Sequence, residues 1–185
     1  MTTEIEIASR RDITLDIVEL AMKGGAIMHA SRLFGVASAE QAAAIMLKGY
    51  ELGLPMTAAF EFIQVVLNKL TLIPRGALAL IHNSGQLVEM IIDEQPGMCT
   101  VTMHRIGGKE YTCTYSLDDA RRAGLVKKDS AWESYPANMM RWRAIGFCAD
   151  VLFPDVLAGL KTADQFGAVP NDEGGIIEGE VITDE

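Results

Sequence analysis

The residues best suited to chemistry or binding lie between positions 127 and 143, where cations and aromatic rings are interleaved. The cations are Lys127, Lys128, Arg141 and Arg143, and the rings are those of Trp132, Tyr135 and Trp142. Flat rings offer unpaired bases a stacking surface worth about 1–3 kcal/mol per base. Lysine and arginine bind the phosphates of the same strand and gain affinity through counterion release. The pattern therefore indicates binding of a single-stranded nucleic acid.

A packed core explains the same residues equally well. Trp132 and Trp142 could be core side chains, and the arginines could be held in ion pairs. The acidic candidates for such pairs are Asp129, Asp150 and Asp155. On a helix, Arg141 and Arg143 are separated by about 200°, so they cannot share one solvent-facing stripe. Because an unpaired buried charge is costly, at least one of them is expected at the edge of a groove or in an ion pair.

A second pair of cations lies upstream and gives a weaker signal. Lys69 is expected in a hairpin turn, and Arg75 follows at the start of the next predicted helix. An exposed lysine in a turn is usually only solvated. We therefore treat Lys69 and Arg75 as secondary candidates for contact with a nucleic acid.

The sequence offers no recognisable catalytic or metal-binding arrangement. No Ser-His-Asp or Cys-His spacing stands out, the three histidines stand alone, and the phosphate loop G-x-x-x-x-G-K-[ST] is missing. The three cysteines form no C-x-x-C pair, and their odd number argues against a disulfide framework. We expect a protein that is not an enzyme, binds no metal and needs no cofactor, with Mg²⁺ at most a modulator of DNA binding.

The net charge of −9 opposes nucleic-acid binding, but the charge is unevenly distributed. From Ala168 onward the chain carries six acidic residues and no basic ones, which accounts for most of the excess. Between Arg121 and Arg143, six basic residues face only two acidic ones. The local field matters more than the net charge for a binding groove. Charges also interrupt every apolar stretch before the ~20 residues that a membrane helix needs, so no membrane association is expected.

Periodicity and capping residues predict the helices that position these side chains. Residues 13–34 have helical spacing, with an interruption at Gly24-Gly25. Ser38 and Gln41 match a capping box at the start of a helix over residues 39–52. Ser116 is predicted to cap a short helix that Gly124 ends. The remaining predicted helices cover residues 56–62, 74–83, 117–123 and 136–152, and a short last turn covers 155–160.

Strand formers and turn residues predict two β-elements. Residues 64–73 read as a hairpin with its turn at Asn68-Lys69. Residues 87–93, 99–104 and 109–115 read as a three-stranded meander. The predicted fold class is therefore α+β, a small antiparallel sheet (hairpin plus meander) packed against several helices, with one long C-terminal core helix. The predicted organisation is a flexible leader (1–12), a single α+β domain (13–167) and an acidic, disordered tail (168–185).

The order and spacing of several motifs resemble those of the RecT family of phage single-strand annealing proteins, which are related to lambda Red beta. In the C-terminal half they are Asp118-Asp119-Ala120, Ala123-Gly124-Leu125, Lys127-Lys128, Trp132, Tyr135-Pro136, Met139-Met140, Arg143-Ala144 and Pro154-Asp155-Val156-Leu157-Ala158-Gly159-Leu160. Upstream, Leu52-Gly53-Leu54-Pro55 and the hairpin of residues 65–72 are similar to the helix-then-hairpin region of that family. The resemblance covers approximately residues 39–167.

The resemblance implies a DNA-annealing domain that binds single-stranded DNA and anneals complementary strands without ATP, in phage-type homologous recombination and DNA repair. It implies a homo-oligomer, either a ring or a helical filament, in the cytoplasm of a bacterium that carries a phage or prophage. Single-stranded DNA and the annealed duplex intermediate would be its ligands, and a phage exonuclease or host single-strand binding protein a further partner. The phosphate contacts would be Lys127, Lys128, Arg141 and Arg143, and Trp132 and Tyr135 would shape the groove or stack in it.

Three features depart from the family pattern. Lys69, and not glycine, follows Asn68 in the hairpin turn, the chain is short, and the tail is strongly acidic. These departures bear on oligomer form and partner binding more than on the fold. The alternative is a phage regulatory or interaction protein that does not anneal DNA, for instance one that uses its acidic tail as a DNA mimic.

Overall fold

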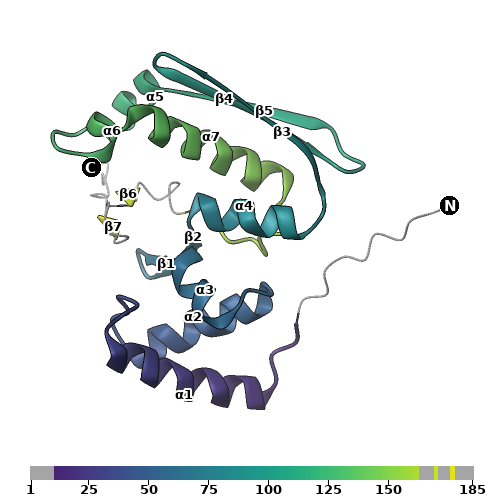
Figure 1. Cartoon of the computed structure of the whole chain (residues 1–185), viewed down its shortest axis with the longest axis vertical. Helices are drawn as coiled ribbons and strands as arrows, with labels where there is room; N and C mark the ends of the chain where they lie inside the picture. The colour runs from purple at the N-terminus through teal and green to yellow at the C-terminus, as the bar shows by residue number, and fades with distance from the viewer. Residues whose placement is uncertain (1–10, 163–168, 171–175, 178–185) are drawn as a thin grey trace, which may run out of the picture. The chain divides into compact units, whose positions relative to one another are not determined.

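A computed structural model describes residues 11–162, 169–170 and 176–177 of the chain (Figure 1). Backbone contacts divide the chain into two compact units, Met1–Gln64 and Val65–Glu185, which are taken one at a time below. The single domain predicted over residues 13–167 stays a prediction, because units of this size can fold together or separately. The leader and the acidic tail lie almost entirely outside the described residues.

The first unit consists of three helices: α1 (Leu15–Ser31), α2 (Ala39–Glu51) and α3 (Met56–Phe62). The predicted cap at Ser38 is confirmed, since its hydroxyl accepts a hydrogen bond from the Gln41 backbone N–H at 3.1 Å. The Gln41 side chain in turn accepts from the backbone N–H of Ala37, one residue before the cap. A hydrophobic cluster of this unit has Ala21, Ala43 and Met46 buried at its centre, with the partly buried Met28, Leu47 and Phe60 packed against them.

Helix α1 runs unbroken through Gly24-Gly25, so the predicted interruption is wrong. Gly25 is buried where α1 packs against α2. A Cβ at Gly25 would stand 2.6 Å from the carbonyl oxygen of Ala39 and 2.8 Å from the amide nitrogen of Ala43. The glycine therefore serves close approach of two helix backbones, which outweighs its unfavourable helix propensity.

The second unit begins with a hairpin, β1 (Ile63–Val66) and β2 (Lys69–Leu72), whose first strand contains the boundary between the units. Its turn residues are Leu67 and Asn68, one position earlier than predicted, and both have a positive φ (49° and 58°). Positive φ at both central residues is typical of the type I′ turn, whose twist matches that of the strands it joins. Lys69 is therefore the first residue of β2.

The rest of the second unit is built around a sheet and a long helix. After α4 (Pro74–Asn83), strands β3 (Leu87–Gln95), β4 (Met98–Arg105) and β5 (Glu110–Ser116) form an antiparallel meander in that order. They are followed by α5 (Leu117–Arg122), α6 (Ala131–Ser134), α7 (Pro136–Leu152) and two short strands, β6 (Val169–Pro170) and β7 (Ile176–Ile177). The predicted α+β class is confirmed.

Helix α7 lies between the sheet and α4, so its two long sides are covered (Figure 1). Alternation along β4 places Cys99, Val101 and Met103 on the face that meets α7. The opposite face carries threonine pairs across β4 and β5, with hydroxyl oxygens 2.9 Å apart for Thr100 and Thr114. Only one face of the sheet is therefore part of the hydrophobic core.

Arg105, at the end of β4, ties the sheet to the C-terminal end of α7. Its guanidinium donates to the carbonyl oxygen of Leu152 at 2.6 Å and to both carboxylate oxygens of Asp155 at 2.6 and 2.7 Å. Hydrogen bonding from Arg105 lowers the pKa of Asp155. Across the described residues, no helix combines the length and the apolar character needed to cross a membrane.

Two neighbouring glycines of α1 provide a matched test of this packing. Gly25→Ala should destabilise the protein by about 1–3 kcal/mol, because its Cβ meets backbone atoms of α2 that cannot move aside. Gly24→Ala should be neutral or stabilising, because its Cβ meets only the flexible end of Met46 and alanine favours the helix by about 1 kcal/mol. Urea unfolding of both variants would measure the difference; equal stability would contradict the close approach.

Candidate nucleic-acid interface

The lysine loop, residues 125–130, is held in a defined turn between α5 and α6. Ser116 and Asp119 form a reciprocal capping box at the start of α5, as predicted for Ser116. Further on, Ser130 donates from its hydroxyl to the carbonyl oxygen of Lys127 at 2.6 Å. The side chains of Lys127 and Lys128 are exposed, and neither forms an ion pair with another described residue. The loop thus presents two adjacent cations to solvent.

An exposed aromatic surface begins where α7 does. Tyr135, the residue before Pro136, is 58% exposed. Within α7, helical spacing places Asn138 and Trp142 on one side, and Tyr135 directly precedes the helix. Arg75, near the start of α4, holds its guanidinium 5.9 Å from the centre of the Trp142 ring. We call these four residues, Tyr135, Asn138, Trp142 and Arg75, the Tyr135 face.

Two of the predicted site residues are in the core instead. Trp132 is 2% exposed, and its ring centre lies 5.9 Å from that of Tyr115 on β5. Its indole nitrogen has no hydrogen-bond partner among the residues that the structure describes. Arg143 is 8% exposed, with its guanidinium 5.7 Å from the same Tyr115 ring. In this structure, neither residue presents a surface to a base or a phosphate, contrary to the expectation from sequence.

Arg141 is half-buried at the surface and paired with Glu94 of β3, 47 residues earlier. One of its two hydrogen bonds joins Nη2 to Oε2 of Glu94 at 3.1 Å. Hydrogen bonding from Arg141 lowers the pKa of Glu94. Of the acidic partners considered from sequence, Asp155 pairs with Arg105. The structure thus places Arg143 inside the fold and Arg141 at its surface.

The structure brings together some predicted site residues and separates others. Arg75 and Trp142 meet although they lie far apart in the sequence, and the lysine loop leads directly into α6 and Tyr135. Lys69 is exposed at the start of β2, outside the face formed by α7 and α4. Sequence reasoning identified Arg75 and Trp142 separately and missed their pairing, because no local pattern joins α4 to α7.

No protein-family model matches the chain, and a search of curated proteins finds no match. The resemblance to the RecT family therefore stays a prediction from the order and spacing of its motifs.

The two arginines of α7 should differ sharply when substituted. Arg143→Ala should lower the free energy of unfolding by about 1–3 kcal/mol, because it removes a buried side chain stacked on Tyr115. Arg141→Ala should cost only about 0.2–1 kcal/mol, because a half-exposed ion pair is screened by solvent. Chemical unfolding of both variants tests this; an equal loss of stability would contradict the assignment of Arg143 to the core.

Proposed function

We propose that this chain binds single-stranded DNA and anneals complementary strands without ATP. The observation that carries the proposal is the Tyr135 face beside the lysine loop. Together the face and the loop provide an exposed ring, a guanidinium over an indole ring, and two cations without described acidic partners. These are the groups that a single strand requires, since its bases can stack on rings or guanidinium planes while its phosphates meet cations.

The chemistry of this surface favours contact that is independent of base sequence. Stacking on Tyr135 uses the face of a base, which every base has, and Lys127 and Lys128 meet phosphates that are the same at every position. The Tyr135 face contains a single side-chain amide, that of Asn138, with which to form hydrogen bonds to a base. Binding of this kind leaves the Watson–Crick edges of the bases available, and a second strand needs those edges for pairing.

The resemblance to the RecT family supports the remaining parts of the proposal. They are a homo-oligomer in the form of a ring or filament, work in the bacterial cytoplasm during phage recombination, and cooperation with an exonuclease or a single-strand binding protein. In such an assembly, many copies of the Tyr135 face would act along one strand. Mg²⁺ would act, if at all, on DNA binding and not on a chemical step.

Stacking and phosphate contact should be separable by substitution. Tyr135→Ala should weaken binding to an oligothymidine strand by about 1–3 kcal/mol through lost stacking, while Tyr135→Phe keeps the ring and should bind normally. The double variant Lys127→Ala with Lys128→Ala should reduce the slope of log K against log salt by about 1.4, because each phosphate contact on a single strand contributes about 0.7. Fluorescence anisotropy at several salt concentrations measures both effects.

A control for the lysines is Lys23→Ala, which removes an exposed cation of α1 that pairs with Glu19, and it should leave the salt dependence unchanged. Absence of single-strand binding by the unmodified protein at low salt would overturn the proposal.

Annealing requires its own measurement. Mixing two complementary labelled oligonucleotides with the protein should speed duplex formation, with or without ATP, and Tyr135→Ala should lose that acceleration. A protein that binds the single strand tightly but does not speed pairing would instead be a non-annealing interaction protein.

A further inference from the structure

The three-stranded sheet has two open edges, β5 on one side and β3 on the other. The backbone N–H of Leu117 donates to the carbonyl oxygen of Gly97 at 2.9 Å, and this bond sets the alternation of the β4–β5 ladder. The N–H and C=O groups of Thr112 and Thr114 therefore point away from β4. Among the described residues, these groups have no backbone partner.

The same alternation determines which backbone groups of β3 are open. Successive residues of β4 bond to β5 and β3 in turn, and Thr102 is one of those that bond to β3. Its partner there is Ile91. Met90 and Ile92, on either side of Ile91, therefore point their N–H and C=O groups away from β4. Each edge of the sheet thus offers free donors and acceptors to a further strand.

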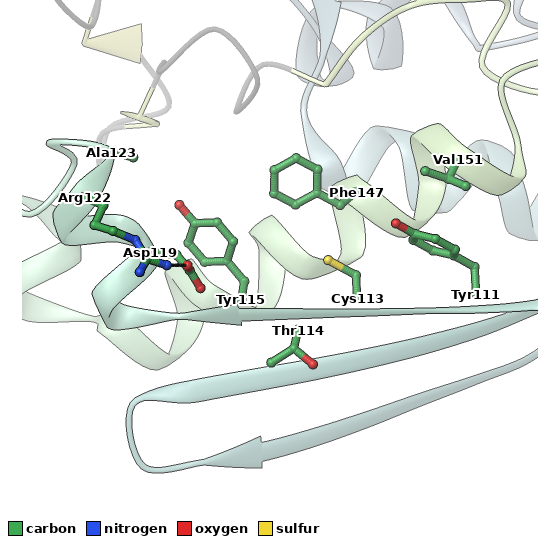
Figure 2. Close-up of a pocket in the computed structure, with 9 residues that line it drawn as sticks. All are labelled: Tyr111, Cys113, Thr114, Tyr115, Asp119, Arg122, Ala123, Phe147 and Val151. Carbon is green, nitrogen blue, oxygen red and sulfur yellow. Dashed lines mark hydrogen bonds and ion pairs between the residues drawn. The ribbon is translucent and has the colours of Figure 1, made fainter.

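An apolar groove of about 600 Å³ lies beside the open edge of β5 (Figure 2). Tyr111, Cys113 and Tyr115 of β5 line one side, and Phe147 and Val151 of α7 line the other. Among the described residues, none from β4 lines the groove, so it lies on the outer side of β5. Val151 is 52% exposed, because α7 extends beyond the strand that it covers.

The opposite edge of the sheet lacks such a cover. Helix α7 packs mainly against β4 and β5 and only slightly against β3. Ile92 shares a face of the sheet with its buried partner Val101, yet it is 37% exposed. Met90, on the same face, is only half-buried. These apolar side chains of β3 are therefore incompletely covered within one copy of the chain.

We propose that β3 of a second copy of this chain adds to β5 as a fourth strand and places its Met90 and Ile92 side chains in the groove. Strand addition of this kind takes its affinity from backbone hydrogen bonds, and the groove accepts alternate side chains. The inference rests on the homo-oligomer of the proposed function and assigns the two surfaces that form it.

The topology of the sheet fixes the orientation of the added strand. Strands β3 and β5 are both antiparallel to β4, so they run in the same direction. Parallel pairing of β5 with the β3 of the next copy keeps α7 of both copies on the same face of the joined sheet. The contact joins two different edges, so it repeats from copy to copy. Such a contact forms a ring where the rotation closes and a filament where it does not.

Charge and cover favour this pairing over the pairing of like edges. Strand β3 has three acidic residues and no basic residue, so two β3 strands side by side would repel each other. Residues 109–116 carry one basic and one acidic residue, so an acidic strand meets no excess of negative charge there. Two β5 strands paired with each other would leave Ile92 uncovered in both copies.

The edge is also large enough for a specific contact. The seven residues of β5 extend about 23 Å. A sheet with one packed helix is about 20 Å thick. The flat projection of the edge is therefore about 460 Å² per copy, or about 900 Å² for both, before the relief of the side chains is counted. This is close to the area of about 1,000 Å² that a specific interface needs.

Two variants that each block one edge test the proposal when they are mixed. Val151→Glu puts a carboxylate in the groove and leaves β3 intact, and Ile92→Glu puts one on β3 and leaves the groove intact. Each variant alone should be monomeric where the unmodified protein assembles, with a dissociation constant raised at least about tenfold by the buried charge. Their equimolar mixture should form a heterodimer and nothing larger, because it contains one intact groove and one intact β3. Sedimentation velocity without DNA measures all three samples.

The matched control is Ile91→Glu, which adds the same charge to the same strand on the face away from α7. Ile91 is exposed, so this variant should fold and assemble like the unmodified protein. Urea unfolding of the three variants should show similar midpoints and thereby establish that the sheet is intact. Loss of assembly in Ile91→Glu equal to that in Ile92→Glu would overturn the proposal, because charge and not the groove would then be responsible.

Three further results would also overturn the proposal. They are an unmodified protein that stays monomeric at every concentration, an edge variant that still assembles alone, and a mixture that stays monomeric. Pairing of two β5 edges, for example, would leave Ile92→Glu dimeric. Binding of a short oligothymidine by the same samples separates this failure from failure of the proposed function. None of the substituted residues belongs to the Tyr135 face or the lysine loop, so single-strand binding should persist in every variant.

Discussion

The packing of the second unit depends on helix α7, which is covered on two sides, by the sheet and by α4. A helix that packs against a sheet on one side and another helix on the other must be apolar around most of its circumference. The sequence of α7 satisfies this with alanine, glycine, cysteine and methionine, which allow close packing. Within this layer the guanidinium of Arg143 lies over the Tyr115 ring.

The candidate interface consists of side chains that remain exposed after α7 has packed against the sheet and α4. At the N-terminal end of α7, Tyr135 extends beyond the packed layers and remains accessible. Helix α4 packs against α7 and supplies Arg75, whose guanidinium lies 5.9 Å from the centre of the Trp142 ring and adds a positive charge to this surface. The Tyr135 face therefore depends on the same helix packing that stabilises the unit, and the lysine loop adds charge without taking part in that packing.

The two faces of the three-stranded sheet also differ in their exposure. Its covered face supplies core side chains, while its open face is lined by paired threonine hydroxyls. Antiparallel sheets with one solvated face commonly show this alternation. The edge at β5 differs from both faces, because unpaired backbone groups and an apolar groove occur together there. The Tyr135 face and the groove are lined by different residues, so they can be tested separately.

The sequence by itself determined most of the longer helices and strands and the α+β class. Helices over residues 74–83 and 136–152, the meander and the caps at Ser38 and Ser116 follow from local signals, which act between residues a few positions apart. Local signals also failed where tertiary packing overrides them, as at Gly25, whose role is the approach of another helix.

Only the tertiary structure decided which side chains face solvent. The interleaved cations and rings of residues 127–143 looked alike in sequence, yet Trp132 and Arg143 are buried while Lys127, Lys128 and Tyr135 are exposed. The pairing of Arg141 with Glu94 spans 47 residues. Burial depends on elements that are distant in sequence, so no local pattern contains this information.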